Sequence, residues 1–158
     1  MSTYDQQLQQ VAEETFENLA FMLVMPDDEP LDADGPQVTC EVDFSGPFGG
    51  RLYLRVSQMM LSPLASNMLG LDFDSDPPSP VQQNDALGEL LNVVCGNVLP
   101  AIAGTEPLFN VSAPKVLEDA DLPTEWQGRQ PAGAVHLELD SGSAELVLFL
   151  DGAAPLAA

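Results

Sequence analysis

The segment from Ser79 to Ala103 limits the possible folds of this chain most strongly. It opens with Ser79, Pro80 and Gln82, which puts serine at a helix N-cap, proline where a missing N–H costs nothing, and glutamine where a capping box needs it. We therefore predict a helix from about Pro80 to Ala103. One side of this helix is apolar and is predicted to face the core, through Leu87, Leu91, Val94, Cys95, Val98 and Ile102.

Several shorter stretches alternate apolar and polar residues, which is typical of strands with one buried face. They lie at 38–44 and 52–56, joined by a turn over 45–50, and at 108–117, 134–139 and 144–150. Apolar residues at three-and-four spacing predict a first helix within residues 5–25. Another helix is predicted from a cap at Ser57 to about Leu69, ended by Gly70. Segments 26–36, 72–80 and 118–133 are predicted loops, rich in acidic residues or proline.

These elements predict an α+β fold with a largely antiparallel sheet and long helices packed on one face. The length of 158 residues favours one domain, over residues 1–158, with a core that needs no disulfide or metal.

The charge of the chain excludes several classes of function. It has 25 acidic residues against 4 basic ones, a formal charge of -21, so it cannot neutralise a row of phosphates and is predicted to bind neither nucleic acid nor an anionic membrane. No apolar run reaches the roughly 18 residues that a membrane-spanning helix needs, and residues 1–10 do not resemble a secretory signal. We expect a cytoplasmic protein, which suits two cysteines without metal or redox spacing.

The polar side of the 80–103 helix carries the most informative pattern. Asp85, Glu89, Asn92 and Gly96 are spaced by four, three and four residues, which returns them to one side of a helix. Glycine inside a helix costs about 1 kcal/mol relative to alanine. Gly96 therefore either leaves a notch for another protein or lets a loop of the same chain pack, and composition alone favours the second interpretation.

This helix resembles the signature of the CheC/CheX/FliY chemotaxis phosphatases. The signature is an acidic residue or serine, then glutamate, two further residues, asparagine and a following glycine, and it is matched within Asp85–Asn97. The details are most similar to the CheX branch. Segment Val111–Val116 also resembles the proline-containing strand that follows this helix in CheX-like proteins, and the order of predicted elements agrees over most of the chain.

The resemblance implies a CheC/CheX-like fold and a phosphatase that hydrolyses the aspartyl phosphate of a response-regulator receiver domain, CheY in the type case. Glu89 matches the glutamate that pairs with the receiver's lysine, and Asn92 matches the asparagine that orients the attacking water, so these are the implied catalytic residues. Asp85, Gly88 and Gly96 are assigned to the partner-binding surface, and Asp85 is left open between an interface and a capping role. The receiver brings Mg²⁺, so no cofactor or metal of the chain's own is expected.

The first helix lacks the second copy of the motif that some relatives carry, because Thr15 and not glutamate stands three residues before Asn18. One active face per chain is therefore expected, and the resemblance also implies a homodimer formed through sheet edges. The rival hypothesis is a non-catalytic receiver-binding, flagellar-switch or scaffold domain of the same fold.

Other side chains that carry chemistry in other proteins are interpreted structurally here. Cys40 and Cys95 are predicted to be buried small hydrophobes, and His136 a strand residue on the polar or partly buried side. Asp72, Asp74 and Asp76 are predicted to lie in a solvated linker. The side chains of four methionines are predicted to fill the core, namely Met22, Met25, Met59 and Met60.

Overall fold

The computed structural model describes residues 3–25, 36–71, 76–117, 130–139 and 142–151. Of the predicted loops, residues 26–35, 72–75 and 118–129 lie outside this description. The helices are α1 (Thr3–Leu19), the 3-10 helix η1 (Gln58–Met60), α2 (Leu61–Leu69) and α3 (Pro80–Ala103). The strands are β1 (Val24–Met25), β2 (Gln37–Ser45), β3 (Gly49–Ser57), β4 (Asn110–Val111), β5 (Lys115–Leu117), β6 (Gly133–Leu139) and β7 (Gly142–Asp151).

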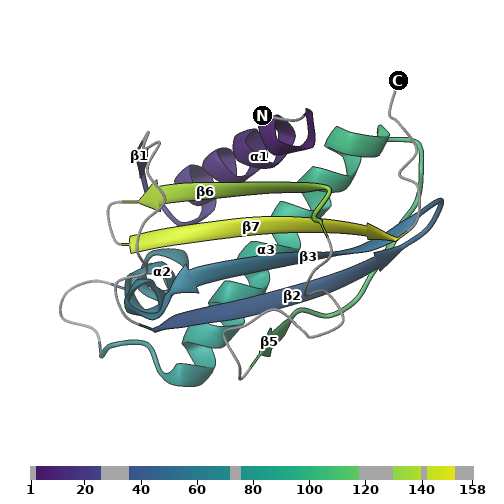
Figure 1. The fold of residues 1–158 in the computed structure, drawn as a ribbon. Helices are drawn as coiled ribbons and strands as arrows, with labels where there is room; N and C mark the ends of the chain where they lie inside the picture. Colours follow the sequence, from purple (N-terminus) through teal and green to yellow (C-terminus); the bar gives the residue numbers. More distant parts are fainter. Residues whose placement is uncertain (1–2, 26–35, 72–75, 118–129, 140–141, 152–158) are drawn as a thin grey trace.

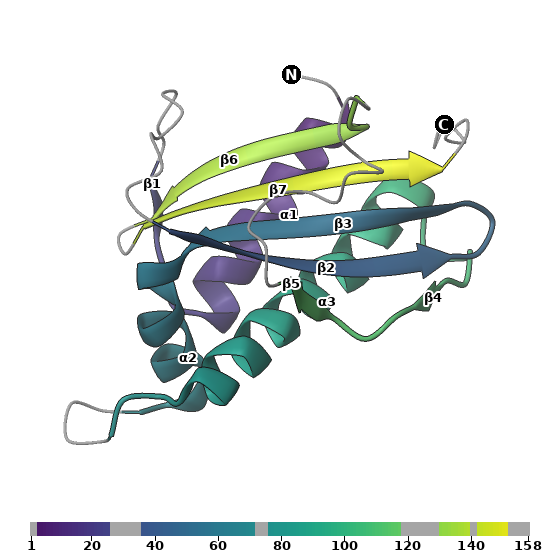
Figure 2. The same cartoon turned by 60° about the horizontal axis from the view of Figure 1, so that its bottom comes forward.

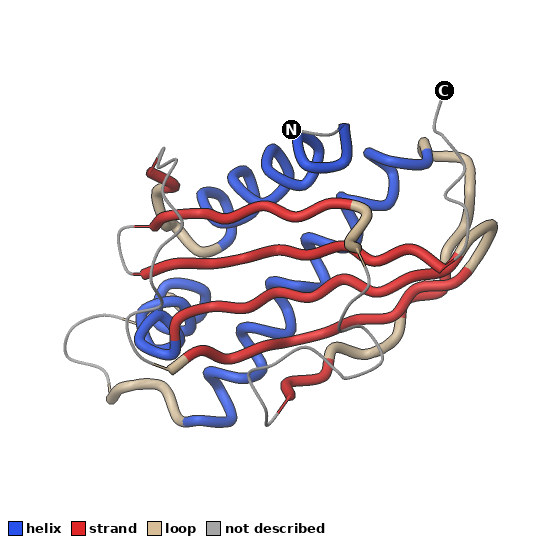
Figure 3. Tube along the Cα trace, viewed as in Figure 1, coloured by secondary structure: helices blue, strands red, loops and turns tan. Residues whose placement is uncertain are grey.

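The strands form one sheet, and the helices cover one of its faces. The strand order is β1-β6-β7-β3-β2-β4, with β5 also paired to β2, and each pairing between described strands is antiparallel. Figures 1 and 2 show α1 and α3 lying along the same face, with α2 near one end of the sheet. Figure 3 separates the two layers by colour. The predicted fold class is confirmed.

The core lies between the sheet and this helix layer. The inner face of the sheet supplies Cys40, Val42, Leu52 and Leu54, all at most 1% exposed. On α3, each residue of the predicted apolar stripe is buried, and the predicted capping box is present, with Ser79 and Gln82 bonded to each other's backbone N–H. Full burial of a large apolar side chain contributes about 1.5–3 kcal/mol, so the stripe determines which side of α3 faces the solvent.

By length and composition, α3 could also cross a membrane, with a mean hydropathy of 1.5 and 56% of the relevant window buried inside the protein. The prediction that no continuous apolar run reaches this length still holds. The apolar residues of α3 are interrupted by small and polar ones, so they form no continuous run although their average is high. The extensive burial is typical of a core helix.

Helix α1 ends earlier than predicted, at Leu19. Phe21 then adopts a positive φ of 53°, and the chain enters β1, where Val24 pairs with Leu139 of β6. The apolar periodicity ran on past the helix because Met22, buried after the turn, falls by coincidence on the same spacing.

Residues 108–117, predicted as a single strand, form the two short strands β4 and β5. Between them the backbone N–H of Ser112 donates to the Asp43 carbonyl, and the Ser112 hydroxyl accepts from the N–H of Asp43. Pro114 follows and has no N–H to donate to a strand partner. The interruption leaves the segment attached to β2 at two places.

Two residues beside α2 differ from prediction. Ser57 stands at the N-cap position of η1, as predicted, but its side chain forms no capping hydrogen bond, and its hydroxyl accepts a hydrogen bond from the N–H of Ser143 in β7, at 3.1 Å. Met59 is 64% exposed rather than part of the core, since it lies on the outer side of the 3-10 turn. Gly70 ends α2 with a φ of 70°, as predicted.

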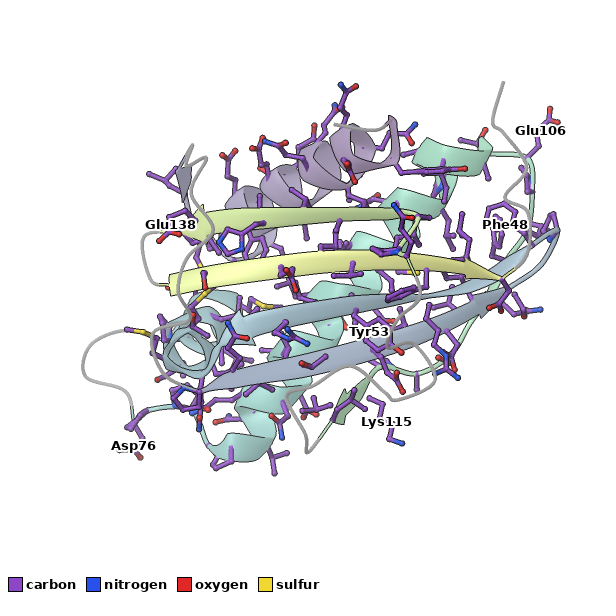
Figure 4. All side chains as sticks on the ribbon, in the orientation of Figure 1. Phe48, Tyr53, Asp76, Glu106, Lys115 and Glu138 are labelled. Atoms are coloured by element: carbon purple, nitrogen blue, oxygen red, sulfur yellow. The ribbon has the colours of Figure 1, made fainter. Side chains whose placement is uncertain are left out.

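The opposite face of the sheet carries a smaller apolar cluster of Tyr53, Val147 and Phe149. The rings of Tyr53 and Phe149 meet edge to face at 5.8 Å. Figure 4 looks onto this face and labels Tyr53. Arg51 and Arg55 flank the cluster and form ion pairs, Arg51 with Asp43 at 2.6 Å and Arg55 with Glu145 at 3.7 Å.

The buried thiols and Tyr53 predict a loss of stability in alkaline solution. Burial raises the pKa of Cys40, of Cys95 and of Tyr53 to about 12 in each case. The unfolded chain releases these protons first, so their contribution to stability is complete below about pH 9 and is lost as the pH rises from about 9 to about 12. We expect the free energy of unfolding, from urea titrations, to be constant up to about pH 9 and to fall between about pH 9 and pH 10.5. Replacement Cys95→Ala should make that fall shallower, and an unchanged pH slope would contradict this explanation.

Candidate functional site

The outward face of α3 borders a hollow in the protein surface, about 500 Å³ in volume. The other wall is the segment around β5, which lies alongside α3 (Figure 2). The residues that line the hollow are Asn84, Asp85, Gly88, Glu89 and Asn92 from α3, with Pro114 and Val116 opposite.

Glu89 and Asn92 are the side chains of most chemical interest in this hollow. Glu89 is exposed and Asn92 is partly buried. Because they are three residues apart on a helix, their Cβ atoms are neighbours at about 5–6 Å. Within the described residues, neither side chain forms an ion pair or a side-chain hydrogen bond. The pair can therefore contact a partner without first breaking an interaction with the described part of this chain.

Gly88 allows the two walls of the hollow to approach each other. A Cβ atom at this position would lie 3.2 Å from Cβ of Pro114, and Gly88 itself is buried. Pro114 is held in place because β5 pairs with Thr39–Glu41 of β2 and Ser112 bonds to Asp43. Gly88, predicted to belong to the partner-binding surface, therefore packs against another segment of the same chain and also lines the hollow.

Gly96 lies one turn beyond Asn92 and does not line the hollow. It is exposed, and a Cβ atom there would meet nothing within 4 Å. The interpretation that composition alone favoured, a loop of this chain packed on Gly96, is therefore wrong for the residues that the structure describes. Asp85 is also exposed, and it does not cap the helix because Ser79 occupies that position.

Sequence reasoning missed the part that Asn84, Pro114 and Val116 play in forming the hollow. Asn84 precedes Gly88 by four residues, so helical spacing was a usable signal for it. Pro114 and Val116 were noted only as part of a family-like strand, and the sequence contains no indication that they lie opposite α3. Such a contact between distant segments depends on the pairing of β5 with β2.

The remaining candidate residues have the predicted structural surroundings. Cys40 and Cys95 are free thiols buried in the core, and His136 is partly buried on β6, opposite Glu145 of β7. Of the three aspartates in the predicted linker, Asp72 and Asp74 lie outside the described residues. Among the residues that were described, no three acidic, histidine or cysteine side chains gather into a metal-binding group.

Comparison with known protein families gives one family model that matches this chain. The family model described as chemotaxis phosphatase CheX matches residues 38–138, which is more than half of the chain and includes both walls of the hollow. The chain belongs to the CheX family. No match was found among curated protein sequences.

Solved structures share the fold of this CheX family member at low sequence identity. CheX from Vibrio vulnificus aligns with a TM-score of 0.70 and 14% identity, covering 95% of this chain and 100% of that one. The CheX–CheY–BeF3–Mg complex from Borrelia burgdorferi aligns with a TM-score of 0.66 and 13% identity, covering 94% and 98%. The FliM middle domain from Vibrio alginolyticus aligns with a TM-score of 0.52 and 13% identity, covering 94% and 90%. At these identities the likeness concerns the fold.

The two glycines of α3 provide a matched test of the hollow's construction. Alanine is favoured over glycine in a helix by about 1 kcal/mol. At Gly96 the added Cβ meets open space, so Gly96→Ala should raise the thermal midpoint by about 2–4 °C. At Gly88 the close contact with Pro114 offsets that gain, so Gly88→Ala should raise it less or lower it. Calorimetry on both variants measures this difference, and greater stabilisation by Gly88→Ala would contradict the close packing.

Proposed function

We propose that this chain is a single-domain, cytoplasmic protein phosphatase that hydrolyses the aspartyl phosphate of a response-regulator receiver domain. The observation that supports this most directly is the pair Glu89 and Asn92, three residues apart, bordering an open hollow without a partner inside the described chain. Membership of the CheX family supports the reaction class, and the Borrelia complex of CheX with CheY supports the choice of partner.

The proposed reaction needs few catalytic groups from the enzyme. An acyl phosphate is already reactive, so hydrolysis needs mainly an aligned water molecule and stabilisation of charge on the transferring phosphoryl group. The carboxamide of Asn92 suits this role because it both accepts and donates hydrogen bonds. A carboxylate in the same place would bring a second negative charge beside the phosphoryl group and raise the energy of the transition state.

Glu89 is proposed to anchor the receiver through an ion pair with the receiver's lysine. Its negative charge is tolerated because it faces a cation and not the phosphoryl group. The receiver contributes Mg²⁺, so the metal belongs to the substrate and this chain provides position and hydrogen bonds. Asp85, one turn earlier and exposed, is placed at the edge of the same interface with no chemical step.

The rival function is binding of a receiver without hydrolysis, as a switch or scaffold component. Its support is that the FliM middle domain shares the fold, and a fold alone does not determine an activity. The presence of both Glu89 and Asn92 at an open hollow favours the enzyme. We also propose a homodimer, for which light scattering during size-exclusion chromatography gives the molecular mass.

Substitutions of Asn92 and of Glu89 should affect the kinetic constants differently. Receivers from the same genome are loaded with a small-molecule phosphodonor, and loss of phosphoprotein is followed with and without this chain. Asn92→Ala should reduce kcat by about 100-fold or more, the cost of removing one transition-state hydrogen-bonding group, with binding largely retained. Asn92→Asp should reduce kcat by a comparable factor, because it places a negative charge beside the phosphoryl group. Glu89→Ala should raise KM about tenfold and also lower the rate.

Matched controls are available on surfaces away from the hollow. Asn97→Ala removes an exposed asparagine of α3, and Glu17→Ala removes an exposed glutamate of α1. Both should behave as the wild type does. If the wild type binds phosphorylated receivers but accelerates dephosphorylation of none, the scaffold function replaces the phosphatase.

Gly96 provides a separate test of how the partner docks. Gly96→Leu places a bulky side chain in open space, so the protein should remain folded with an unchanged circular dichroism spectrum. Because Gly96 lies on the same side of α3 as Glu89 and Asn92, the leucine should obstruct the receiver and lower kcat/KM at least tenfold. Normal turnover by a folded Gly96→Leu protein would show that the receiver does not approach this part of α3.

A further inference from the structure

A second hollow continues from the candidate site toward the N-terminal end of α3. Its volume is about 480 Å³, and it shares Asn84 and Val116 with the first hollow. Its further walls come from the start of α3, from η1 and α2, and from the first residues of β2. In Figure 1, α2 and the start of β2 lie near the start of α3. The residues used below are Val38, Gln58, Leu61 and Gln83.

The second hollow differs from its surroundings in charge. The chain has 25 acidic residues, yet the described residues lining this hollow are apolar or carry carboxamides. The first hollow, in contrast, contains the carboxylates of Asp85 and Glu89. Covering an apolar surface is favourable by about 25 cal/mol per Å², whereas covering unpaired carboxylates carries a large desolvation cost. The second hollow is therefore suited to an uncharged, apolar segment of a partner.

The walls of this hollow are held by hydrogen bonds within the chain. Gln83 donates through Nε2 to the carbonyl of Pro78 at 3.0 Å, and the backbone N–H of Gln58 donates to the carbonyl of Pro36 at 2.9 Å. Leu61 is anchored in the core, at 4% exposure. A surface that is ordered before a partner arrives loses little conformational entropy on binding.

A typical protein interface is large enough to cover both hollows. Stable protein complexes cover about 800 Å² on each partner, which is far more than the contact area of Glu89 and Asn92 alone. A receiver whose phosphorylated pocket lies over Asn92 must therefore extend over adjacent surface. Asn84 and Val116 belong to both hollows, so the second hollow is part of that adjacent surface.

We propose that the second hollow is a docking subsite that takes an uncharged, apolar segment of the receiver next to its phosphorylated pocket, and so contributes to the choice among receivers. The proposal rests on the proposed function for the identity of the partner. The first hollow provides the chemistry, and the second provides affinity that differs between receivers according to the segment they present.

Gln58 is the best residue for a test, because it is exposed and lines the second hollow but not the first. Gln58→Trp fills the hollow, and Gln58→Glu introduces a charge with almost no change in shape. Both should raise KM for a phosphorylated receiver about tenfold and leave kcat within about twofold. The matched controls Gln6→Trp and Gln6→Glu, at an exposed position of α1, should change neither constant.

A second measurement does not depend on catalysis. A photo-crosslinking amino acid at position 58 should capture a receiver activated with beryllofluoride and Mg²⁺, and the same group at position 6 should not. Loss of kcat with KM unchanged, or no effect of either Gln58 variant, would overturn the subsite while leaving wild-type phosphatase activity intact. Capture of a second copy of this chain, instead of the receiver, would also overturn it. Capture without any wild-type turnover would retain the subsite and reject the phosphatase.

Discussion

The burial of the apolar stripe of α3 against the sheet is the interaction on which the other features depend. Leu87 and Leu91 have no exposed surface, and turning the helix would bring them into water at a cost of about 1.5–3 kcal/mol for each side chain. The orientation of α3 is therefore determined by the core. Glu89 and Asn92, on the other side of the same helix, need no interactions of their own to face outward.

The second constraint is the attachment of β5 to β2. This pairing brings Pro114 against Gly88, so a surface that would otherwise be one exposed helix face becomes a hollow with two walls. Since the wall is held by backbone pairing and by the bond between Ser112 and Asp43, its position does not depend on a ligand. A hollow lined by few functional groups suits the proposed reaction, in which the substrate would carry the metal and the reactive bond.

Much of the fold was predictable because local signals and packing agreed. The capping box at Ser79 and Gln82, the stripe of α3 and the alternation in β2 and β3 all gave the observed elements. The errors occurred where a tertiary contact required a backbone conformation different from the one that the local pattern predicts. Periodicity extended the first helix past Leu19, where pairing of β1 with β6 required a turn, and alternation joined β4 to β5, where hydrogen bonds between Ser112 and Asp43 replaced the strand ladder.

The sequence by itself determined that Glu89 and Asn92 share the solvent side of a helix, because helical spacing and the apolar stripe are both local properties. It also identified the family to which that helix is similar. Only the tertiary structure decided that Gly88 is covered by Pro114, that Gly96 is open, and that Val38, Gln58 and Leu61 line a second hollow beside the first. These contacts join segments far apart in the chain, and their positions follow from sheet pairing and core packing, which no local pattern encodes.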